Sequence, residues 1–415
     1  MPTVPALDVP TARLAAARAA APASARRRIV VVTQPAGWGG TEVNTVGVVR
    51  ELAARGHAVT VLQLGDDVYD RYLSTPQPFA TVTVPMPEPL EHLSVRWWCR
   101  LLRGCRPDVV VLSKGAFDIQ APALDLAVRL LARRYVLLEH HPATPPPARS
   151  SRRHLGGLLP GLALWWWRKQ LPRRLHLRAA HRIITDSAFV TDILAEHYAL
   201  PRARAVCVPW GIDVTRFTFR ADARQRLRDG WGLPPEALVV GSVGRLAVVK
   251  GPDRALRAFA ALREARPALP AWLVLAGEGP EAEAMRTLAE ELGIADRVVL
   301  PGFVEDAAEA LSALDVYLMP SRSEGLGMAL IEAMACERSC VAMNSGGPGE
   351  ILTDPSLGWL TPADDVAAFT VALLTAVEED EAARAARGRR ARAHVVARFD
   401  ERRQTGRVAG LIESA

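Results

Sequence analysis

Residues 29–42 read IVVVTQPAGWGGTE, and this stretch decides the fold of the first part of the chain. Its first five residues are aliphatic or β-branched without interruption, as in a strand that is covered on both faces of a sheet. A glycine-rich turn follows, and a helix is expected from Thr41 until Gly56 closes it. Residues 58–62 then form the next strand. Strand, glycine-rich turn, helix and strand in this order are a βαβ unit.

The alternation of strand and helix patterns continues along the chain. Later strands of the first half are expected at 109–112, 135–138 and 182–185. A second series begins after Pro209, with expected strands at 238–243, 271–276, 298–300 and 316–319 and expected helices at 252–266, 281–292 and 307–313. Alternating strands and helices indicate parallel sheets. The sequence therefore predicts two Rossmann-like α/β domains, residues 29–205 and 206–393.

Length and composition limit the class of protein. At 415 residues and 44.9 kDa the chain exceeds what one hydrophobic core usually serves, so two domains with a ligand cleft between them are expected. No uninterrupted apolar run reaches the roughly 20 residues that a membrane-spanning helix needs. Charged residues, among them Asp8 and Arg13, interrupt the first 28 residues, which we expect to be a disordered extension and not a secretory signal. Five cysteines without a Cys-x-x-Cys pair are typical of a reduced cytoplasmic protein.

The positive charge of the chain is almost entirely arginine. A net charge of +6 and an isoelectric point near 9.3 favour acidic ligands or an anionic surface. Of 51 basic residues only Lys114, Lys169 and Lys250 are lysine. A remaining lysine is either a chance survivor or a residue needed for its compact ammonium group.

Residues 323–335, SEGLGMALIEAMA, are the strongest candidate for a ligand site. Glycines open a loop directly before an apolar helix, so backbone N–H groups and the positive end of the helix dipole face outward and form a seat for an anion. Glu324 and Glu332 flank this seat. Because carboxylates repel phosphate but accept hydrogen bonds from hydroxyls, the combination predicts a ligand with both phosphates and sugars. The alternative is a structural helix with two solvated glutamates.

A second candidate loop, residues 244–251, lies between the strand at 238–243 and the helix at 252–266. In a parallel sheet, loops at the carboxyl ends of the strands line the ligand crevice. Arg245 and Lys250 would then neutralise a diphosphate. Two solvated loop cations are the structural alternative.

The first half of the chain offers two weaker candidates. Residues 37–40, GWGG, do not have the Gly-x-Gly-x-x-Gly spacing of a dinucleotide site, but they allow a phosphate ligand to approach the backbone. His140 follows the strand at 135–138 and can bind a sugar hydroxyl or act in catalysis, or be structural. His140-His141 is not followed by metal-ligand spacing, so no metal is expected.

Residues 164–169, LWWWRK, with Arg173 and Arg174 combine aromatic and basic side chains. This mixture is typical of a peripheral contact with the inner membrane surface or of an acceptor that carries a lipid. The alternative is a helix whose tryptophans pack inside the protein.

Together these motifs resemble the retaining glycosyltransferases of the GT-B fold, family 4, over roughly residues 29 to 400. The segments that carry the resemblance are Gly39 to Glu42, Glu139-His140, Asp186-Ser187, Pro209 to Asp213 with Phe217, residues 244–251, residues 277–280, and Glu324 to Glu332 as the family's Glu-x7-Glu motif. The chain departs from the family at Trp210, where Asn is more usual, and at residues 337–339, where Gly-x-Pro is usual.

The resemblance implies a role for each matching residue. Arg245 and Lys250 would hold the diphosphate of the donor, Glu332 its ribose, and Glu324 the transferred sugar. His140 would face that sugar. The remaining donor contacts implied are Gly39, Gly40, Gly277, Gly279, Gly325, Leu326, Gly327 and Met328. The segment 394–415 would be the helix that returns to the first, acceptor-binding domain.

We therefore expect a cytoplasmic, metal-independent, retaining transferase. It would move a hexose from a nucleotide diphosphate sugar to a glycan, a lipid-linked or a small-molecule acceptor in the synthesis of envelope polysaccharide or glycoconjugate, with no other cofactor and no nucleic acid. A sugar-nucleotide epimerase and a non-enzymatic nucleotide-sugar-binding protein are the alternatives. The base, the sugar and the acceptor are read by pocket shape, which the sequence does not give.

Overall fold

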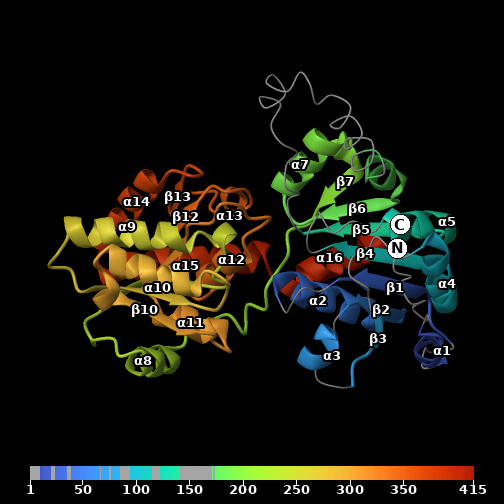
Figure 1. Cartoon of the computed structure of the whole chain (residues 1–415), viewed down its shortest axis with the longest axis horizontal. Coiled ribbons are helices and arrows are strands. Elements are labelled where there is room, and N and C mark those ends of the chain that lie inside the picture. The colour runs from blue at the N-terminus through green and yellow to red at the C-terminus, as the bar shows by residue number, and fades with distance from the viewer. Residues whose placement is uncertain are drawn as a thin grey trace, which may run out of the picture. The chain divides into compact units, whose positions relative to one another are not determined.

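In the computed structural model the described residues are 10–19, 24–34, 39–65, 67–73, 76–84, 94–114, 122–140, 171 and 173–415. The chain divides into two compact units, Met1–Pro209 with Arg402–Ala415, and Trp210–Glu401. Each unit is built on one parallel sheet with helices packed on it (Figure 1). The predicted α/β class with two sheets is confirmed.

The first unit contains a seven-stranded sheet in the order β3-β2-β1-β4-β5-β6-β7, with neighbouring strands parallel. Its strands are β1 (Arg28–Thr33), β2 (Ala58–Leu64), β3 (Ala80–Val84), β4 (Val109–Lys114), β5 (Tyr135–Glu139), β6 (Arg182–Thr185) and β7 (Ala205–Cys207). The helices between them are α2 (Gly40–Ala54), α3 (Val68–Tyr72), α4 (Val95–Cys105), α5 (Pro122–Leu131) and α7 (Ala188–Tyr198), with a 3-10 turn at Arg202–Arg204. The central strands are buried on both faces, as their continuous aliphatic sequences predict.

The N-terminal segment differs from the prediction. Residues 1–28 were expected to be disordered, but Thr11–Ala19 form helix α1. Leu14 is buried in the core cluster of the first unit, and the Arg18 side chain donates a hydrogen bond of 3.0 Å to the Gly104 carbonyl. The buried Leu14, the partly buried Ala17 and this long-range hydrogen bond hold an Ala- and Arg-rich stretch whose composition alone resembles a linker.

The second unit contains a six-stranded parallel sheet in the order β10-β9-β8-β11-β12-β13. Its strands are β8 (Leu238–Val243), β9 (Ala271–Ala276), β10 (Val298–Gly302), β11 (Val316–Met319), β12 (Ser339–Met343) and β13 (Trp359–Thr361). Its helices are α8 (Ala221–Gly230), α9 (Pro252–Ala265), α10 (Ala282–Glu291), α11 (Ala307–Ala313), α12 (Met328–Ala335), α13 (Pro348–Ile351), α14 (Val366–Glu378) and α15 (Glu381–Arg398), with 3-10 turns at Val248–Lys250 and Ala295–Arg297. From β8 the chain adds strands first towards one edge of the sheet (β9, β10) and then, from β11, towards the other edge. The loops after β8 and β11 therefore meet at the switch point where α/β sheets bind ligands.

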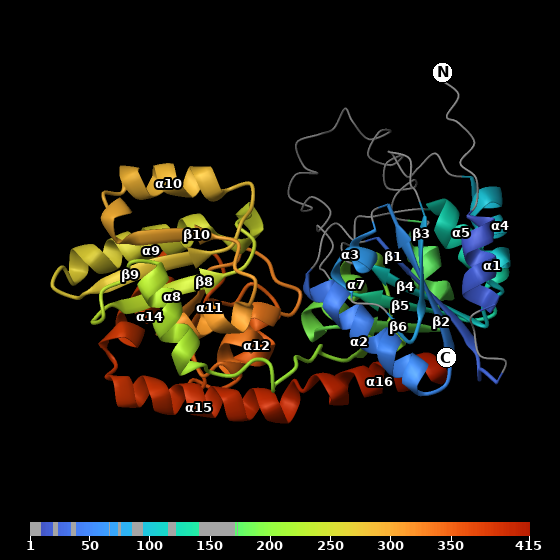
Figure 2. The ribbon, with the colours of Figure 1, turned by 90° about the horizontal axis from the view of Figure 1, so that it is seen from below.

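The last two helices belong to different units. Helix α15 packs beside α12 in the second unit, whereas α16 (Glu401–Glu413) lies along the first unit near α2 (Figure 2). Glu413 accepts hydrogen bonds of 2.8 Å from both Arg55 and His57, and Arg55 also donates to the Gly406 carbonyl at 2.9 Å. The returning helix was expected from residue 394; α15 continues to Arg398, and the change of unit comes at Arg402.

Candidate functional site

The loop before α12 has the geometry that its glycines predict. Gly327 caps the helix with φ 103°, a left-handed conformation that a side chain would strain. Glu324 lies in the loop, three residues ahead, and its backbone is held by hydrogen bonds from its N–H to the Ser345 carbonyl (3.1 Å) and from the Gly347 N–H to its own carbonyl (3.2 Å). A Cβ on Gly347 would come within 2.3 Å of the Leu326 backbone. Gly347, which the sequence analysis did not select, therefore lets the two loops touch.

Lys250 and Glu324 meet in the structure. The Lys250 ammonium donates to both carboxylate oxygens of Glu324, at 2.8 and 3.0 Å, and the Ser321 hydroxyl donates to one of them at 2.7 Å. Glu324 is buried, whereas the Lys250 side chain remains 40% exposed. The buried carboxylate is thus compensated by a cation that still reaches solvent, and Ser321 is a third member that the sequence analysis missed.

Lys250 is placed by the turn that ends at Gly251. Residues Val248–Lys250 form a 3-10 turn, and Gly251 follows in a left-handed conformation with φ 67°. A Cβ at Gly251 would lie 2.2 Å from the Pro320 carbonyl, at the end of the neighbouring strand β11. Close contact between the two loops therefore requires glycine here, and it sets the distance between Lys250 and Glu324.

The backbone of Gly277 and Gly279 packs closely against the loop that carries Arg245. A Cβ on Gly277 would lie 1.9 Å from the Gly244 carbonyl oxygen, and one on Gly279 would lie 2.1 Å from that of Leu246. Backbone hydrogen bonds of 2.9 Å (Gly244 to Ala276) and 2.8 Å (Leu246 to Glu278) join the loops. Leu246 is buried and Arg245 is exposed to solvent. Both glycines were expected to contact the donor; their contacts here are with the loop that carries Arg245.

Glu332 lies in the second turn of α12, behind Glu324. Burial raises the pKa of its carboxyl to about 7, while the positive charges of Arg216 and Lys250 act in the opposite direction. Arg216, another residue that the sequence analysis did not select, follows a turn closed by Asp213, whose carboxylate accepts from the amides of Thr215 and Arg216 at 2.9 and 3.2 Å. A pKa of about 7 means that this carboxyl can gain or lose its proton near neutral pH.

The first unit brings together fewer of the predicted residues. Gly39 is extended (φ −155°, ψ −170°) and Gly40 begins α2. His140 directly follows β5, is buried, and has its Nε2 3.0 Å from the Ser113 hydroxyl. The other members of these two motifs, Gly37, Trp38, His141 and Pro142, lie outside the described residues.

The basic part of the aromatic segment is partly buried. Arg173 packs over the Tyr198 ring with its guanidinium 5.0 Å from the ring centre, and lies 3.8 Å from the buried Glu139 carboxylate. Arg174 donates to the His197 carbonyl at 3.5 Å. Arg173 is buried against its own unit, which for this residue favours the alternative of packing inside the protein. Membrane contact of the segment stays a prediction. Residues 164–169 lie outside the described part of the chain.

The described residues offer neither a metal-binding cluster nor a membrane-spanning helix. Among them no group of three or more His, Cys, Asp or Glu side chains is placed to hold a metal ion. In the same part of the chain, no helix combines the length and the apolar character needed to cross a membrane.

Comparison with known proteins identifies the family. Residues 38–216 match the family described as Glycosyltransferase Family 4, and residues 223–394 match Glycosyl transferases group 1. The 2-deoxystreptamine N-acetyl-D-glucosaminyltransferase of Streptomyces fradiae is 31% identical over 366 residues, which are 83% of this chain and 83% of that protein. This chain belongs to glycosyltransferase family 4.

Other family 4 relatives and solved structures extend the comparison. The D-inositol 3-phosphate glycosyltransferase of Streptomyces avermitilis is 35% identical over 225 residues, 52% of this chain and 48% of that protein. The chain spans about half the length of the curated relatives of this name that it matches. The crystal structure of Anabaena HepE in complex with UDP and glucose has a TM-score of 0.75 at 19% identity, covering 94% of this chain and 100% of that one. This likeness shows the GT-B fold.

The two departures from the family pattern are accommodated locally. Trp210 is buried, and the next residue, Gly211, passes so close to Asp400 that a Cβ would lie 2.6 Å from its carbonyl. Glu337, at the usual glycine position, takes the left-handed conformation with φ 62°. Neither change touches the Lys250 and Glu324 pair.

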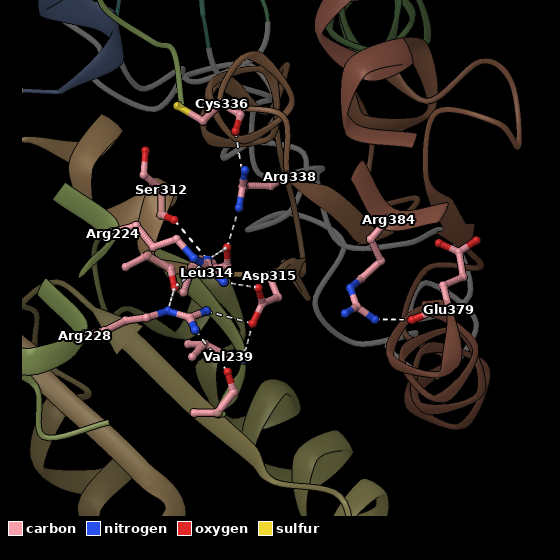
Figure 3. A network of polar contacts seen from close by, with 12 residues as sticks. Arg224, Arg228, Val239, Ser312, Leu314, Asp315, Cys336, Arg338, Glu379 and Arg384 are labelled. Carbon is pink, nitrogen blue, oxygen red and sulfur yellow. Dashed lines mark hydrogen bonds and ion pairs between the residues drawn. The ribbon is translucent and has the colours of Figure 1, made fainter. Parts of the chain in front are cut away.

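Arg338, the second residue of the replaced Gly-x-Pro, joins a network at the opposite end of the strands from the site. Arg224 and Arg228 donate to the two carboxylate oxygens of Asp315 at 2.6 and 2.8 Å, and Arg338 donates to the Leu314 carbonyl at 2.7 Å (Figure 3). Burial lowers the pKa of Arg338 to about 10, chiefly by desolvation and then by the charge of Arg224. The network ties α8 to the residues at the amino-terminal ends of β8 and β11.

Proposed function

We propose that this protein is a retaining glycosyltransferase that takes a hexose from a nucleotide diphosphate sugar. The observation that carries the proposal is the Lys250 and Glu324 pair, because a buried carboxylate and a solvent-reaching cation stand together where a glycine loop opens into α12. A diphosphate needs cations and helix amides, whereas a sugar needs hydrogen-bond acceptors. Both are present at the switch point of the second sheet.

Each residue has a defined part in this proposal. Negative charge develops on the diphosphate as the glycosidic bond breaks, and Lys250 with Arg245 stabilises it. Glu324 stabilises the positive charge that develops on the sugar ring. Glu332 accepts hydrogen bonds from the ribose hydroxyls. His140 and the amides of Gly39 and Gly40 contribute to binding the sugar.

We propose retention by front-face attack, in which the departing phosphate oxygen receives the proton of the acceptor hydroxyl. Glu324 is not a covalent nucleophile in this scheme, and its hydrogen bonds with Lys250 and Ser321 are consistent with an electrostatic role. The anomeric configuration of the product, determined by NMR, tests this directly. An inverted product, or a glycosylated Glu324 found by mass spectrometry, contradicts it.

The acceptor proposed for the first assay is a cyclitol or a cyclitol-bearing lipid. Two relatives are named for inositol phosphate and 2-deoxystreptamine, both six-membered carbocycles with several hydroxyl or amino groups. The experiment incubates the purified chain with UDP- and GDP-hexoses and with these acceptors. A glycosylated acceptor supports the proposal; an isomerised donor without acceptor indicates an epimerase, and binding without turnover indicates a binding protein.

We also propose that catalysis needs no divalent metal, since Lys250, Arg245 and the α12 amides supply the positive potential that a metal would provide. Turnover is expected to persist in excess EDTA. Complete loss of activity that magnesium or manganese restores would refute this part of the proposal.

A further inference from the structure

Arg322 joins the loop after β11 to the turn that carries Lys250. Its backbone N–H donates to the Val249 carbonyl at 2.8 Å, and its Nη1 donates to the Val248 carbonyl, also at 2.8 Å. The nitrogens Nη1 and Nη2 donate to the two carboxylate oxygens of Asp253, at 2.8 and 2.7 Å, in the first turn of α9. One residue therefore holds both the turn and the helix that follows it.

The turn at Val248–Lys250 has little other support. None of its side chains is buried. Val248 and Val249 are 57% and 38% exposed, so apolar packing contributes little to the position of the turn. The close approach at Gly251 allows the turn to lie beside the loop that carries Glu324. The hydrogen bonds from Arg322 then hold it there.

The contact between Arg322 and Asp253 is a bidentate ion pair. Their side chains are 33% and 28% exposed, and two parallel hydrogen bonds fix the geometry of the guanidinium. The hydrogen bonds between them lower the pKa of Asp253 and raise the pKa of Arg322, so both are charged at neutral pH. Because both terminal nitrogens of Arg322 are engaged by this pair and by Val248, the side chain is placed to hold the turn.

We propose that Arg322 is a positioning residue that presents Lys250 to the diphosphate of the donor. Arg322 fixes the backbone of the turn, and the Lys250 ammonium then lies 2.8 Å from the Glu324 carboxylate. A cation that is already in place needs no reorganisation when charge develops on a leaving group. Presentation to the donor rests on the proposed function, whereas the position of Lys250 beside Glu324 does not.

The first test observes Lys250 itself. Since Lys114, Lys169 and Lys250 are the lysines of the chain, carbon-13 NMR of the full chain with labelled lysine gives one Cε signal for each. The Lys250 signal is assigned by its absence in Lys250→Arg, and Glu324→Gln shows where it lies without an ionised partner. In Arg322→Ala the signal is expected to move towards its position in Glu324→Gln. An unchanged signal in the folded variant overturns the inference.

Removal of Asp253 distinguishes positioning from direct binding of the donor by Arg322. Asp253→Ala removes the partner of the guanidinium, so the Lys250 signal is expected to move and kcat to fall, as in Arg322→Ala. If Arg322 bound the diphosphate directly, Asp253→Ala would free its guanidinium, and donor affinity and kcat would be retained or increased. That result overturns the inference.

Two further variants keep this comparison interpretable. Arg286→Ala removes an exposed arginine from its pair with Glu283 in α10, and should change neither the Lys250 signal nor kcat. Circular dichroism shows whether each variant is folded. Should the alanine variants of Arg322 and Asp253 fail to fold, Asp253→Asn serves instead, because it removes the charge and keeps the shape of the side chain.

Kinetics separate the inference from the proposed function. In Arg322→Ala, kcat is expected to fall about tenfold, a part of the roughly 10²-fold loss expected when Lys250 is removed. Because Arg322 acts through Lys250, Arg322→Ala added to Lys250→Ala should lower kcat by no more than about twofold. An equal fall in both backgrounds, or a moved Lys250 signal with full kcat in Arg322→Ala, overturns the inference. If Lys250→Ala retains full kcat while the signal moves in Arg322→Ala, the position of Lys250 is confirmed and the proposed function fails.

Discussion

Two of the glycine-rich turns that lead from a parallel strand into a helix, those before α2 and α12, each have a nearby glutamate, and they differ in what this glutamate does. At α2, Glu42 follows the glycines, is buried, and accepts backbone hydrogen bonds, one of them from the capping residue Gly39. At α12, Glu324 precedes the glycines and accepts from the side chains of Lys250 and Ser321. A glutamate inside the helix caps it. Glu324, which precedes the loop, does not cap the helix; side chains of neighbouring loops hold its carboxylate.

The pKa values of the neighbouring groups reinforce this difference. Burial raises the pKa of Glu42, and the backbone hydrogen bonds act in the opposite direction. At α12 the group with a raised pKa is Glu332, one turn into the helix, and the charges that oppose its burial are Arg216 and Lys250. The first turn satisfies its carboxylate with backbone, whereas the second has partly exposed cations beside its carboxylates, and the proposed phosphate ligand would bind these cations.

The largest effect is expected from Lys250→Ala, which removes the cation from the α12 turn. Turnover should fall by about 10²-fold or more, the usual cost of losing one donor that stabilises transition-state charge. The measurement is steady-state and single-turnover kinetics with a nucleotide sugar. Arg286→Ala is the control, since Arg286 pairs with Glu283 at 2.8 Å within helix α10 of the same unit. Weaker donor binding with unchanged turnover would contradict the role of Lys250.

A smaller effect is expected from pH. In the proposed function Glu332 binds the ribose, and only its ionised carboxylate can accept hydrogen bonds from both ribose hydroxyls. Its pKa is raised to about 7. As pH falls through that value the acceptor is lost, so donor affinity should be about tenfold weaker at pH 6 than at pH 8. Titration calorimetry with a nucleotide sugar measures this change. Glu332→Gln should bind weakly at both pH values, and a pH dependence that survives in this variant would assign the titration to another group.

The raised pKa of Glu332 also makes the free energy of unfolding depend on pH. The folded protein binds this proton more tightly than the unfolded chain, so the contribution of Glu332 to the free energy of unfolding is greatest below its ordinary pKa of 4.5. That contribution is lost as pH rises towards about 7. In the proposed function, binding of the donor ribose to the ionised form would add a stabilisation at neutral pH that the free protein lacks.

The smallest effect concerns the C-terminal end of α12. Glu337 takes a left-handed conformation where glycine would not be strained. Glu337→Gly should stabilise the protein by about 1 kcal/mol, seen as a rise of a few degrees in the melting temperature, with unchanged kinetics. Glu337→Ala is the control, because alanine keeps the strain. Equal melting temperatures for the glycine and alanine variants would show that the strain is absent.

Continuous aliphatic runs made most of the fold predictable. The strands β6, β8, β9 and β11 and helix α11 have the predicted bounds. The sequence analysis missed β3, β7, β12 and β13. Two of these, β7 and β13, are three-residue strands at sheet edges. The five-residue strand β12 (SCVAM) contains Ala, which is depleted in strands. These segments form strands because they pair with neighbouring strands, and the sequence of the segment alone does not show this pairing.

The part of the candidate site that could be predicted consists of motif residues that directly follow an expected strand. Arg245, Lys250, Glu324 and Glu332 come from loops or helices that follow β8 and β11, as the expected strands required. Ser321 and Gly347 were missed because their importance lies in contacts between loops, at 2.7 Å to Glu324 and against Leu326. A serine after a strand and a glycine in a turn are common in any sequence, so only the folded chain distinguishes them.

Glu324→Gln and Glu42→Gln, compared for turnover and melting temperature, test the central claim most directly. The account predicts that Glu324→Gln loses about 10²-fold in kcat with the fold retained, because the charge beside the reacting sugar is gone. Glu42→Gln should instead affect the melting temperature and leave kcat of the folded protein within a few-fold of wild type. Full turnover in Glu324→Gln, or an equal loss of kcat in a fully folded Glu42→Gln, would contradict the account.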